Sequence, residues 1–164
     1  MMGSTLQDGT HRFIADCHLG RLAKYLRFMG YDTLFFPTIP DTEMIKIARD
    51  EERTVLTRDT ALARRKNVPV YLLEALGLHD QLRELAVHFG LNPGDDAHRR
   101  CLICNAPLVR VCAVAIRNAV PEQVYATFDT FRQCPECGRI YWHGDHYRKM
   151  LRFLKTALEQ TARS

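Results

Sequence analysis

The chain has 164 residues, of which 46% are hydrophobic and 26% are charged, as in an ordinary globular protein. This length suits one domain of about 100–150 residues with a small addition, and excludes a multidomain assembly. No apolar run approaches the ~18 residues of a membrane span, and residues 1–10 lack the apolar core of a signal peptide. We therefore expect a cytoplasmic protein that has no membrane partner.

The formal net charge of +4 comes entirely from the C-terminal part of the chain. Residues 91–164 hold 11 Lys and Arg against 7 Asp and Glu, whereas residues 1–90 hold 12 of each kind. A basic lobe weakly favours a polyanion such as RNA as a partner. A solvated basic surface without a ligand explains the charge equally well.

Short apolar segments alternate with segments of helical periodicity in the first 90 residues. The expected strands are 12–16, 32–36, 54–57 and 69–73, and the expected helices are 19–29, 41–52, 60–66 and 79–89. Gly30 is expected to close the first helix. Four strand–helix alternations predict an α/β fold with a parallel sheet.

Residues 90–100 (GLNPGDDAHRR) contain Gly, Pro and acidic residues without an apolar period, which predicts a linker. We therefore expect an α/β domain over residues 11–90 and a small lobe over residues 99–146, with β-prone segments around 108–114 and 124–131. A C-terminal helix over residues 147–161, within a helical pattern that starts at 145, is expected to pack back on the α/β domain. Its apolar face would be Tyr147, Met150, Leu151, Leu154 and Leu158, and its outer face Arg148, Arg152 and Lys155.

Three aspartates are expected at one edge of the sheet. Asp16 ends the first strand and Asp59 follows the third, and the carboxyl ends of parallel strands share an edge where ligands bind. Asp41, at the start of the second helix, can reach the same edge. Three neighbouring carboxylates repel one another unless a cation such as Mg²⁺ or Mn²⁺ neutralises them. This pattern indicates metal-dependent phosphodiester hydrolysis.

Each of these acids also has a purely structural interpretation. Asp16 suits a turn between strand and helix, and Asp41 and Asp59 suit helix capping. Other chemistries have less support, because the sequence has no GxxxxGK[ST] phosphate loop and no GxSxG turn. A thiol nucleophile at Cys17 beside His18 is disfavoured, since neighbours in an extended strand point to opposite faces.

The first helix carries a basic face with aromatic residues. Arg21, Lys24 and Phe28 lie roughly on one side with Tyr25 and Arg27 beside them, away from the apolar stripe. Because the helix starts directly after Asp16, this face can hold a phosphodiester backbone. A solvated basic stripe whose stems cover the core is the alternative.

Two CxxC pairs, Cys101/Cys104 and Cys134/Cys137, are separated by 29 residues. Four thiolates form a closed tetrahedral site, so the pairs predict a structural Zn²⁺. Because the lobe is too small to fold by burial alone, the ion would supply much of its stability.

The remaining cysteines and two histidines receive simpler interpretations. Cys17 and Cys112 are expected to be small apolar fillers of the interior. His143 and His146 are expected at the surface or against RNA.

Several segments together resemble the Mut-seven C-terminal RNase domain family. They are FIAD (13–16), LGRLA (19–23), LRFMGYD (26–32), TVLTRD (54–59), RCLICNAPL (100–108), VP (120–121) and CPECGRIYWHGDHY (134–147). The resemblance runs from about residue 12 to about residue 150. It implies a PIN-like nuclease domain with an appended zinc ribbon, and an acidic site for Mg²⁺ or Mn²⁺.

The resemblance carries the acidic roles onto Asp16, Asp41 and Asp59, with Glu43 as a rival to Asp41 and Asp80 as a fourth acid. Arg21 and Arg58 are then expected to contact phosphate, or to pair with the acids when no metal is bound. PIN-like domains often pair, which leaves a homodimer open.

The sequence therefore predicts a cytoplasmic ribonuclease that binds RNA, with Arg21, Lys24, Arg58 and Arg148 on the substrate. Two alternatives remain: a non-catalytic RNA- or ribosome-binding module, and a zinc-ribbon interaction protein with no nucleic-acid role.

Overall fold

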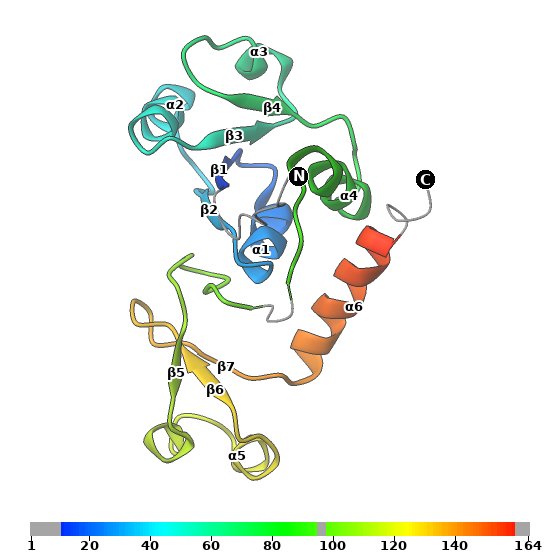
Figure 1. The fold of residues 1–164 in the computed structure, drawn as a ribbon. Helices are drawn as coiled ribbons and strands as arrows, with labels where there is room; N and C mark the ends of the chain where they lie inside the picture. The colour runs from blue at the N-terminus through cyan, green and yellow to red at the C-terminus, as the bar shows by residue number, and fades with distance from the viewer. Residues whose placement is uncertain (1–10, 95–97, 160–164) are drawn as a thin grey trace, which may run out of the picture.

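The computed structural model describes residues 11–94 and 98–159, so residues 1–10 and the end of the expected C-terminal helix lie outside it. Strands and helices alternate in the first part of the chain, as predicted. They are β1 (Arg12–Ala15), α1 (Gly20–Phe28), β2 (Asp32–Phe35), α2 (Asp41–Asp50), β3 (Thr54–Thr57), α3 (Thr60–Ala63), β4 (Val70–Leu72) and α4 (Leu78–Phe89). The strands form one parallel sheet in the order β2-β1-β3-β4 (Figure 1). The predicted α/β fold is confirmed.

Both faces of this sheet are covered by helices. Side chains alternate between the faces along a strand, so Phe13 and Ala15 belong to a core with α1 and α4, whereas Ile14 belongs to a second core with α2 and α3. Because both faces are buried, the strands read as continuous apolar runs rather than as alternating ones.

A smaller lobe follows the α/β part. Its antiparallel sheet has the order β5-β6-β7, from β5 (Val109–Val111), β6 (Phe131–Gln133) and β7 (Ile140–Tyr141). A 3-10 turn, η1 (Ala113–Ile116), and a helix, α5 (Glu122–Thr127), lie between β5 and β6. The expected β-structure at 108–114 and 124–131 is therefore only partly correct. Pro121 directly precedes α5 and Glu122 lies in its first turn, a helix-start pattern that outweighs the β-prone residues.

The C-terminal helix α6 (Asp145–Glu159) runs from the small lobe to α4 and packs against it (Figure 1). Met150, Leu154 and Ala157 are buried in the core shared with α1 and α4. Arg148, Arg152 and Lys155 are exposed on the outer side. Among the described residues, no helix is both long and apolar enough to cross a membrane.

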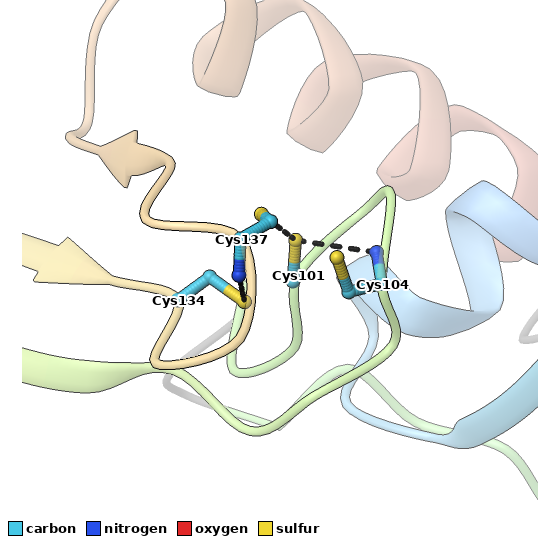
Figure 2. Close-up of side chains that lie close together, drawn as sticks. All are labelled: Cys101, Cys104, Cys134 and Cys137. Carbon is cyan, nitrogen blue, oxygen red and sulfur yellow. Dashed lines mark hydrogen bonds between the residues drawn. The ribbon is translucent and has the colours of Figure 1, made fainter.

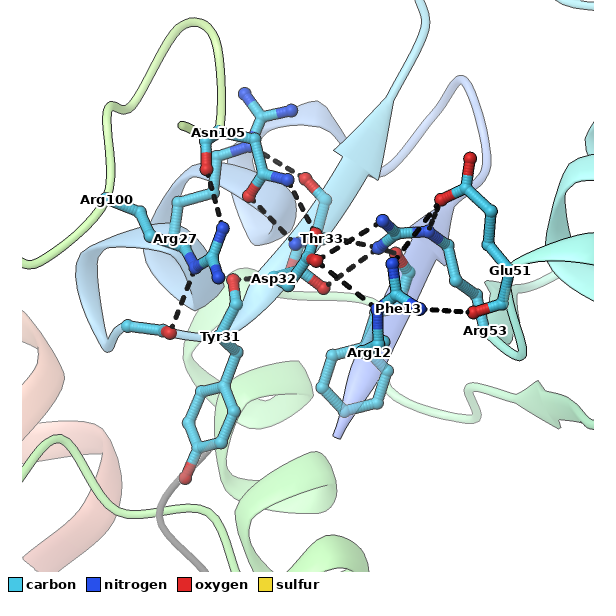
Figure 3. Close-up of polar contacts among 11 residues, drawn as sticks. Arg12, Phe13, Arg27, Tyr31, Asp32, Thr33, Glu51, Arg53, Arg100 and Asn105 are labelled. Carbon is cyan, nitrogen blue, oxygen red and sulfur yellow. Dashed lines mark hydrogen bonds and ion pairs between the residues drawn. The ribbon is translucent and has the colours of Figure 1, made fainter. Parts of the chain in front are cut away.

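A polar network at the amino edge of the sheet joins the two lobes (Figure 3). The carboxylate of Asp32 accepts hydrogen bonds from Arg53 Nη1 at 2.7 Å and from Asn105 Nδ2 at 2.7 Å, and Asn105 Oδ1 accepts from the backbone N–H of Thr33. Burial alone raises the pKa of Asp32, but the Arg53 and Asn105 hydrogen bonds outweigh it and lower this pKa to about 2. Asp32 is therefore ionised whenever the network is intact.

Arg27 forms the second connection between the lobes. Its buried guanidinium donates to Thr33 O at 2.8 Å and to Leu102 O at 2.9 Å and Ile103 O at 3.2 Å in the small lobe. The prediction that Arg27 and Phe28 lie away from the apolar stripe of α1 is wrong, because both are buried. The rings of His98 and Tyr147 cover Phe28, so α1 is buried by the sheet on one side and by the rest of the chain on another.

Asp32→Ala should lower the free energy of unfolding by about 3 kcal/mol, because the side chain of Arg53 is 4% exposed and would keep only the more exposed Glu51 as a counter-charge. Urea denaturation measures this change. Asp50→Ala is the matched control, since Asp50 pairs with Lys46 and Arg49 only at the exposed surface and its loss should give no measurable change.

The contribution of Asp32 is also pH-dependent, since its folded pKa lies below the ordinary 3.8. It should be present above pH 3.8 and be lost as the pH falls towards 2. Equal losses in the free energy of unfolding for Asp32→Ala and Asp50→Ala would contradict this role for Asp32.

Candidate functional site

The four cysteines of the CxxC pairs meet in the small lobe (Figure 2). One sulfur from each residue lies within 4.8 Å of all the others, with Cys101 and Cys134 buried and Cys104 and Cys137 exposed. In the described part of the chain, this is the only group of three or more His, Cys, Asp or Glu side chains that lie so close together.

The two pairs adopt the same backbone turn. The N–H of Cys104 points at Cys101 Sγ and that of Cys137 at Cys134 Sγ, at 3.4 and 3.5 Å. The next residues, Asn105 and Gly138, both have a positive φ, of 68° and 75°. Gly and Asn tolerate this conformation best. Two matching turns of this kind present their sulfurs to a common centre.

Tyr141 supports this centre and was missed in the sequence, where it stands among other aromatic residues without a distinctive spacing. Its hydroxyl lies 3.2 Å from Cys101 Sγ. Burial raises the pKa of Cys101, but hydrogen bonds from Tyr141 and from backbone N–H groups outweigh it and lower the pKa. Cys101 therefore favours the thiolate form that binds metals, whereas the neighbouring sulfurs raise the pKa of Cys104 and burial raises that of Cys134.

Four cysteine sulfurs at this spacing could hold one tetrahedral ion such as Zn²⁺, with no position left for a substrate. The other two cysteines do not fill the interior. The prediction that Cys17 and Cys112 are apolar fillers is wrong, because both are exposed. Cys112 directly precedes η1, and Cys17 lies two residues beyond the end of β1, so both lie in exposed connections.

A second candidate site lies at the opposite, carboxyl edge of the parallel sheet. β1 is flanked by β2 on one side and β3 on the other, so the strand order reverses between β1 and β3. Ligands bind at such points in open α/β sheets. A cavity of about 410 Å³ lies here, lined by Asp16, Cys17, His18, Leu19, Asp41, Arg58, Asp59, Leu76 and Gln81.

Asp16 is held firmly in this cavity. Its backbone N–H donates to Leu56 O at 3.0 Å, its Oδ1 accepts from Cys17 N at 2.6 Å, and its Oδ2 accepts from Thr57 Oγ1 at 2.8 Å. The buried Thr57 hydroxyl in turn accepts from Asp59 N at 3.0 Å. Thr57 therefore links the two strand-end aspartates, a role hidden in the sequence because Thr57 reads only as a strand residue.

The capping alternative is correct for Asp59 and wrong for Asp41. Asp59 caps α3 by accepting from Ala61 N at 2.7 Å and Leu62 N at 3.4 Å, both through Oδ1. Its Oδ2 has no hydrogen bond to the described residues, so the cap leaves one oxygen for a ligand. Asp41 is the first residue of α2 and does not cap it, because Pro40 occupies the cap position.

Asp41 and Asp59 are exposed, whereas Asp16 is half-buried. No ion pair joins Arg21 or Arg58 to these acids within residues 11–94 and 98–159, although Arg58 lines the cavity. Asp80 lies outside it and pairs with Arg83 at 3.2 Å. The residue of α4 that lines the cavity is Gln81 instead, and its Nε2 donates a hydrogen bond to Ala75 O at 3.1 Å.

Cys17 also lines the acidic cavity, but its chemistry is weak. Desolvation and the neighbouring Asp16 carboxylate raise the pKa of this thiol. Because the thiolate is the nucleophile, a protonated thiol beside a carboxylate does not favour covalent catalysis.

The fold and both sites define a parallel α/β protein with an acidic switch-point cavity and an appended metal-binding lobe. Residues 11–154 match the family described as the Mut7-C RNAse domain, and the chain belongs to this family. Membership points to a nuclease-like function. No curated protein and no solved structure gave a match.

Cys137→Ser should abolish stoichiometric zinc binding, whereas Cys112→Ser should keep about one zinc per chain, because only Cys137 belongs to the tetrahedral set. Metal content of the purified variants, measured by atomic emission, tests this prediction. Zinc retained at full occupancy by Cys137→Ser would show that another residue completes the site.

Proposed function

We propose that the protein is a metal-dependent ribonuclease whose acidic cavity hydrolyses RNA phosphodiester bonds. The observation that carries this proposal is the position of Asp16 and Asp59, which follow neighbouring strands where the strand order reverses. Asp41 from α2 lines the same cavity. Family membership supports a nuclease for the same site.

The donor set of the cavity fits Mg²⁺ or Mn²⁺. Carboxylate oxygens are the ligands that these ions prefer, and Mg²⁺ commonly uses one or two carboxylates with several waters. Asp16, Asp41 and Asp59 would hold the ion or ions. When bound, a divalent ion lowers the pKa of an attacking water and neutralises charge that develops on the phosphate.

The surrounding side chains have separate roles in this proposal. Thr57 donates its O–H to Asp16 and so fixes the carboxylate as an acceptor. Arg58 at the cavity wall would bind a phosphate oxygen. Leu76, which is 76% exposed beside the carboxylates, would contact an apolar part of the nucleotide. Arg21 and Arg148 are exposed and would contact the RNA backbone further out.

The four-cysteine lobe would hold a structural Zn²⁺ and position RNA rather than take part in hydrolysis. None of the six cysteines is in a disulfide. Free thiols persist in reducing compartments, so we propose a cytoplasmic location.

A non-catalytic RNA- or ribosome-binding module is the second candidate function. It is favoured by the spread of the acidic side chains, which are not all within 4.8 Å of one another. The absence of a fourth acid from the described cavity lining favours it too. The two functions differ in whether the acidic cavity supports turnover.

The wild-type protein should cleave end-labelled RNA with Mn²⁺, and Asp16→Asn/Asp59→Asn should reduce the rate by more than the ~10–100-fold typical of losing an outer partner of a metal site. Asp50→Asn/Asp129→Asn removes the same charge from exposed positions outside the cavity and should cleave normally. Zinc content confirms that all the proteins are folded. Equal rates in all three proteins would leave only the binding module.

Thr57→Val keeps the shape of a buried strand residue but removes the hydroxyl that orients Asp16. We expect the Mn²⁺ concentration for half-maximal cleavage to rise by about 10-fold, because outer partners tune metal affinity. Titration of the cleavage rate with Mn²⁺ measures this shift. An unchanged midpoint would mean that Thr57 has only a packing role.

A further inference from the structure

A second large cavity, of about 500 Å³, lies between α1 and the small lobe, and no step of the proposed hydrolysis uses it. Its volume falls in the ~300–1,000 Å³ range of small-ligand sites. Its lining comes from α1, both cysteine turns, the segment before α5, β7 and α6, and includes Lys24, Ile103, Val120, Arg139, Tyr141 and Trp142.

The charge of this cavity favours an anion. Lys24 and Arg139 are exposed and make no ion pair with the described residues. No acidic residue is among the described residues that line the cavity. Two cations without counter-charges on one concave surface favour an anionic ligand over a neutral one.

The rest of the wall favours a flat, partly apolar group. Trp142 is half-buried at the cavity and is the only tryptophan in the chain. A Cβ at Gly144 would lie 2.7 Å from Trp142 Nε1, so only glycine at this position leaves room for the indole. Tyr141 and the apolar side chains of Ile103 and Val120 complete the surface. Aromatic groups beside cations bind a base and its phosphate together.

The shape of the site distinguishes unpaired RNA from duplex RNA. Bases of an A-form duplex are stacked inside the helix, which presents mainly phosphates and 2′-hydroxyls. Lys24 and Arg139 would meet phosphates of either form, but the apolar and aromatic part of the wall offers nothing to the outside of a duplex. That part of the wall fits a base that is free to leave the stack.

Helix α1 connects this cavity to the acidic one. Leu19, directly before α1, lines the acidic cavity, and Lys24 lines the second cavity. Lys24 lies four residues beyond Gly20, or about 6 Å along the helix axis. Arg21 is exposed between them.

We propose that the cavity between α1 and the small lobe binds an unpaired nucleotide of the RNA strand that is cut at the acidic cavity, which makes single-stranded RNA the substrate class. This inference rests on the proposed ribonuclease function for the cut, but the binding step is measured without cleavage.

The test uses the cleavage-silent Asp16→Asn/Asp59→Asn protein and a short single-stranded oligoribonucleotide, with the affinity measured by fluorescence anisotropy. Adding Lys24→Gln/Arg139→Gln should weaken binding about 10-fold. It should also make the slope of log affinity against log salt shallower by about 1.4, since two phosphate contacts are lost. Adding Lys46→Gln/Arg110→Gln instead removes the same charge from exposed positions outside the cavity and should change neither value.

The intrinsic fluorescence of Trp142 reports on the cavity itself, since no other tryptophan contributes. It should be quenched by single-stranded RNA and much less by a duplex of the same sequence. Trp142→Leu, which keeps an apolar side chain, should weaken binding at least about 5-fold through lost stacking.

Unchanged Trp142 fluorescence on RNA binding, or equal losses in the two double-charge variants, would overturn the inference while leaving the nuclease intact. Conversely, normal binding at this cavity by a wild-type protein that never cleaves RNA would overturn the ribonuclease and leave the binding site. Tighter binding of duplex than of single-stranded RNA would overturn the assigned substrate class.

Discussion

The buried guanidinium of Arg27 is the interaction on which the relation between the two lobes depends. It bonds Thr33 O at the start of β2 and the carbonyls of Leu102 and Ile103 inside the first cysteine turn. A buried cation is costly unless it is surrounded by acceptors and negative charge. Burial lowers the pKa of Arg27, but the nearby Cys101 and Cys104 oppose this shift when they are thiolates. The cysteine turn therefore stabilises the charge that attaches it to the sheet.

This attachment fixes the last turn of α1, while the start of the helix lies beside the acidic cavity. The first residues of α1 follow the strand that supplies Asp16, and its last turn lies against the cysteine lobe through Arg27 and Phe28. α1 therefore lies between the two cavities and is mostly buried rather than lying at the surface. Its one exposed side carries Arg21 and Lys24. A strand of RNA that follows α1 would meet the acidic cavity at one end and the cavity between α1 and the small lobe further along.

The sequence was informative wherever the determining contacts are local. Short apolar segments that alternate with helical segments predicted the parallel sheet, and the CxxC spacing predicted the four-sulfur cluster. It failed where a distant segment decides the environment: α1 shows one apolar stripe, but the small lobe buries a second side, so Arg27 and Phe28 were placed wrongly. Strand order is also non-local. The reversal between β1 and β3, which makes Asp16 and Asp59 neighbours across a shared Thr57, is decided by how the helices cover the sheet.

The same two backbone turns hold the four cysteines and form part of the wall of the cavity between α1 and the small lobe. Leu102 and Ile103 lie between the cysteines of the first turn, and Gly138 and Arg139 directly follow the second. An ion that holds the two turns together would therefore also set the distance between two walls of the cavity. Tyr141 has both roles within one side chain, since it lines the cavity and its hydroxyl contacts Cys101 Sγ. If the proposed RNA site is correct, a metal held by the four cysteines would in this way determine how tightly RNA is bound there.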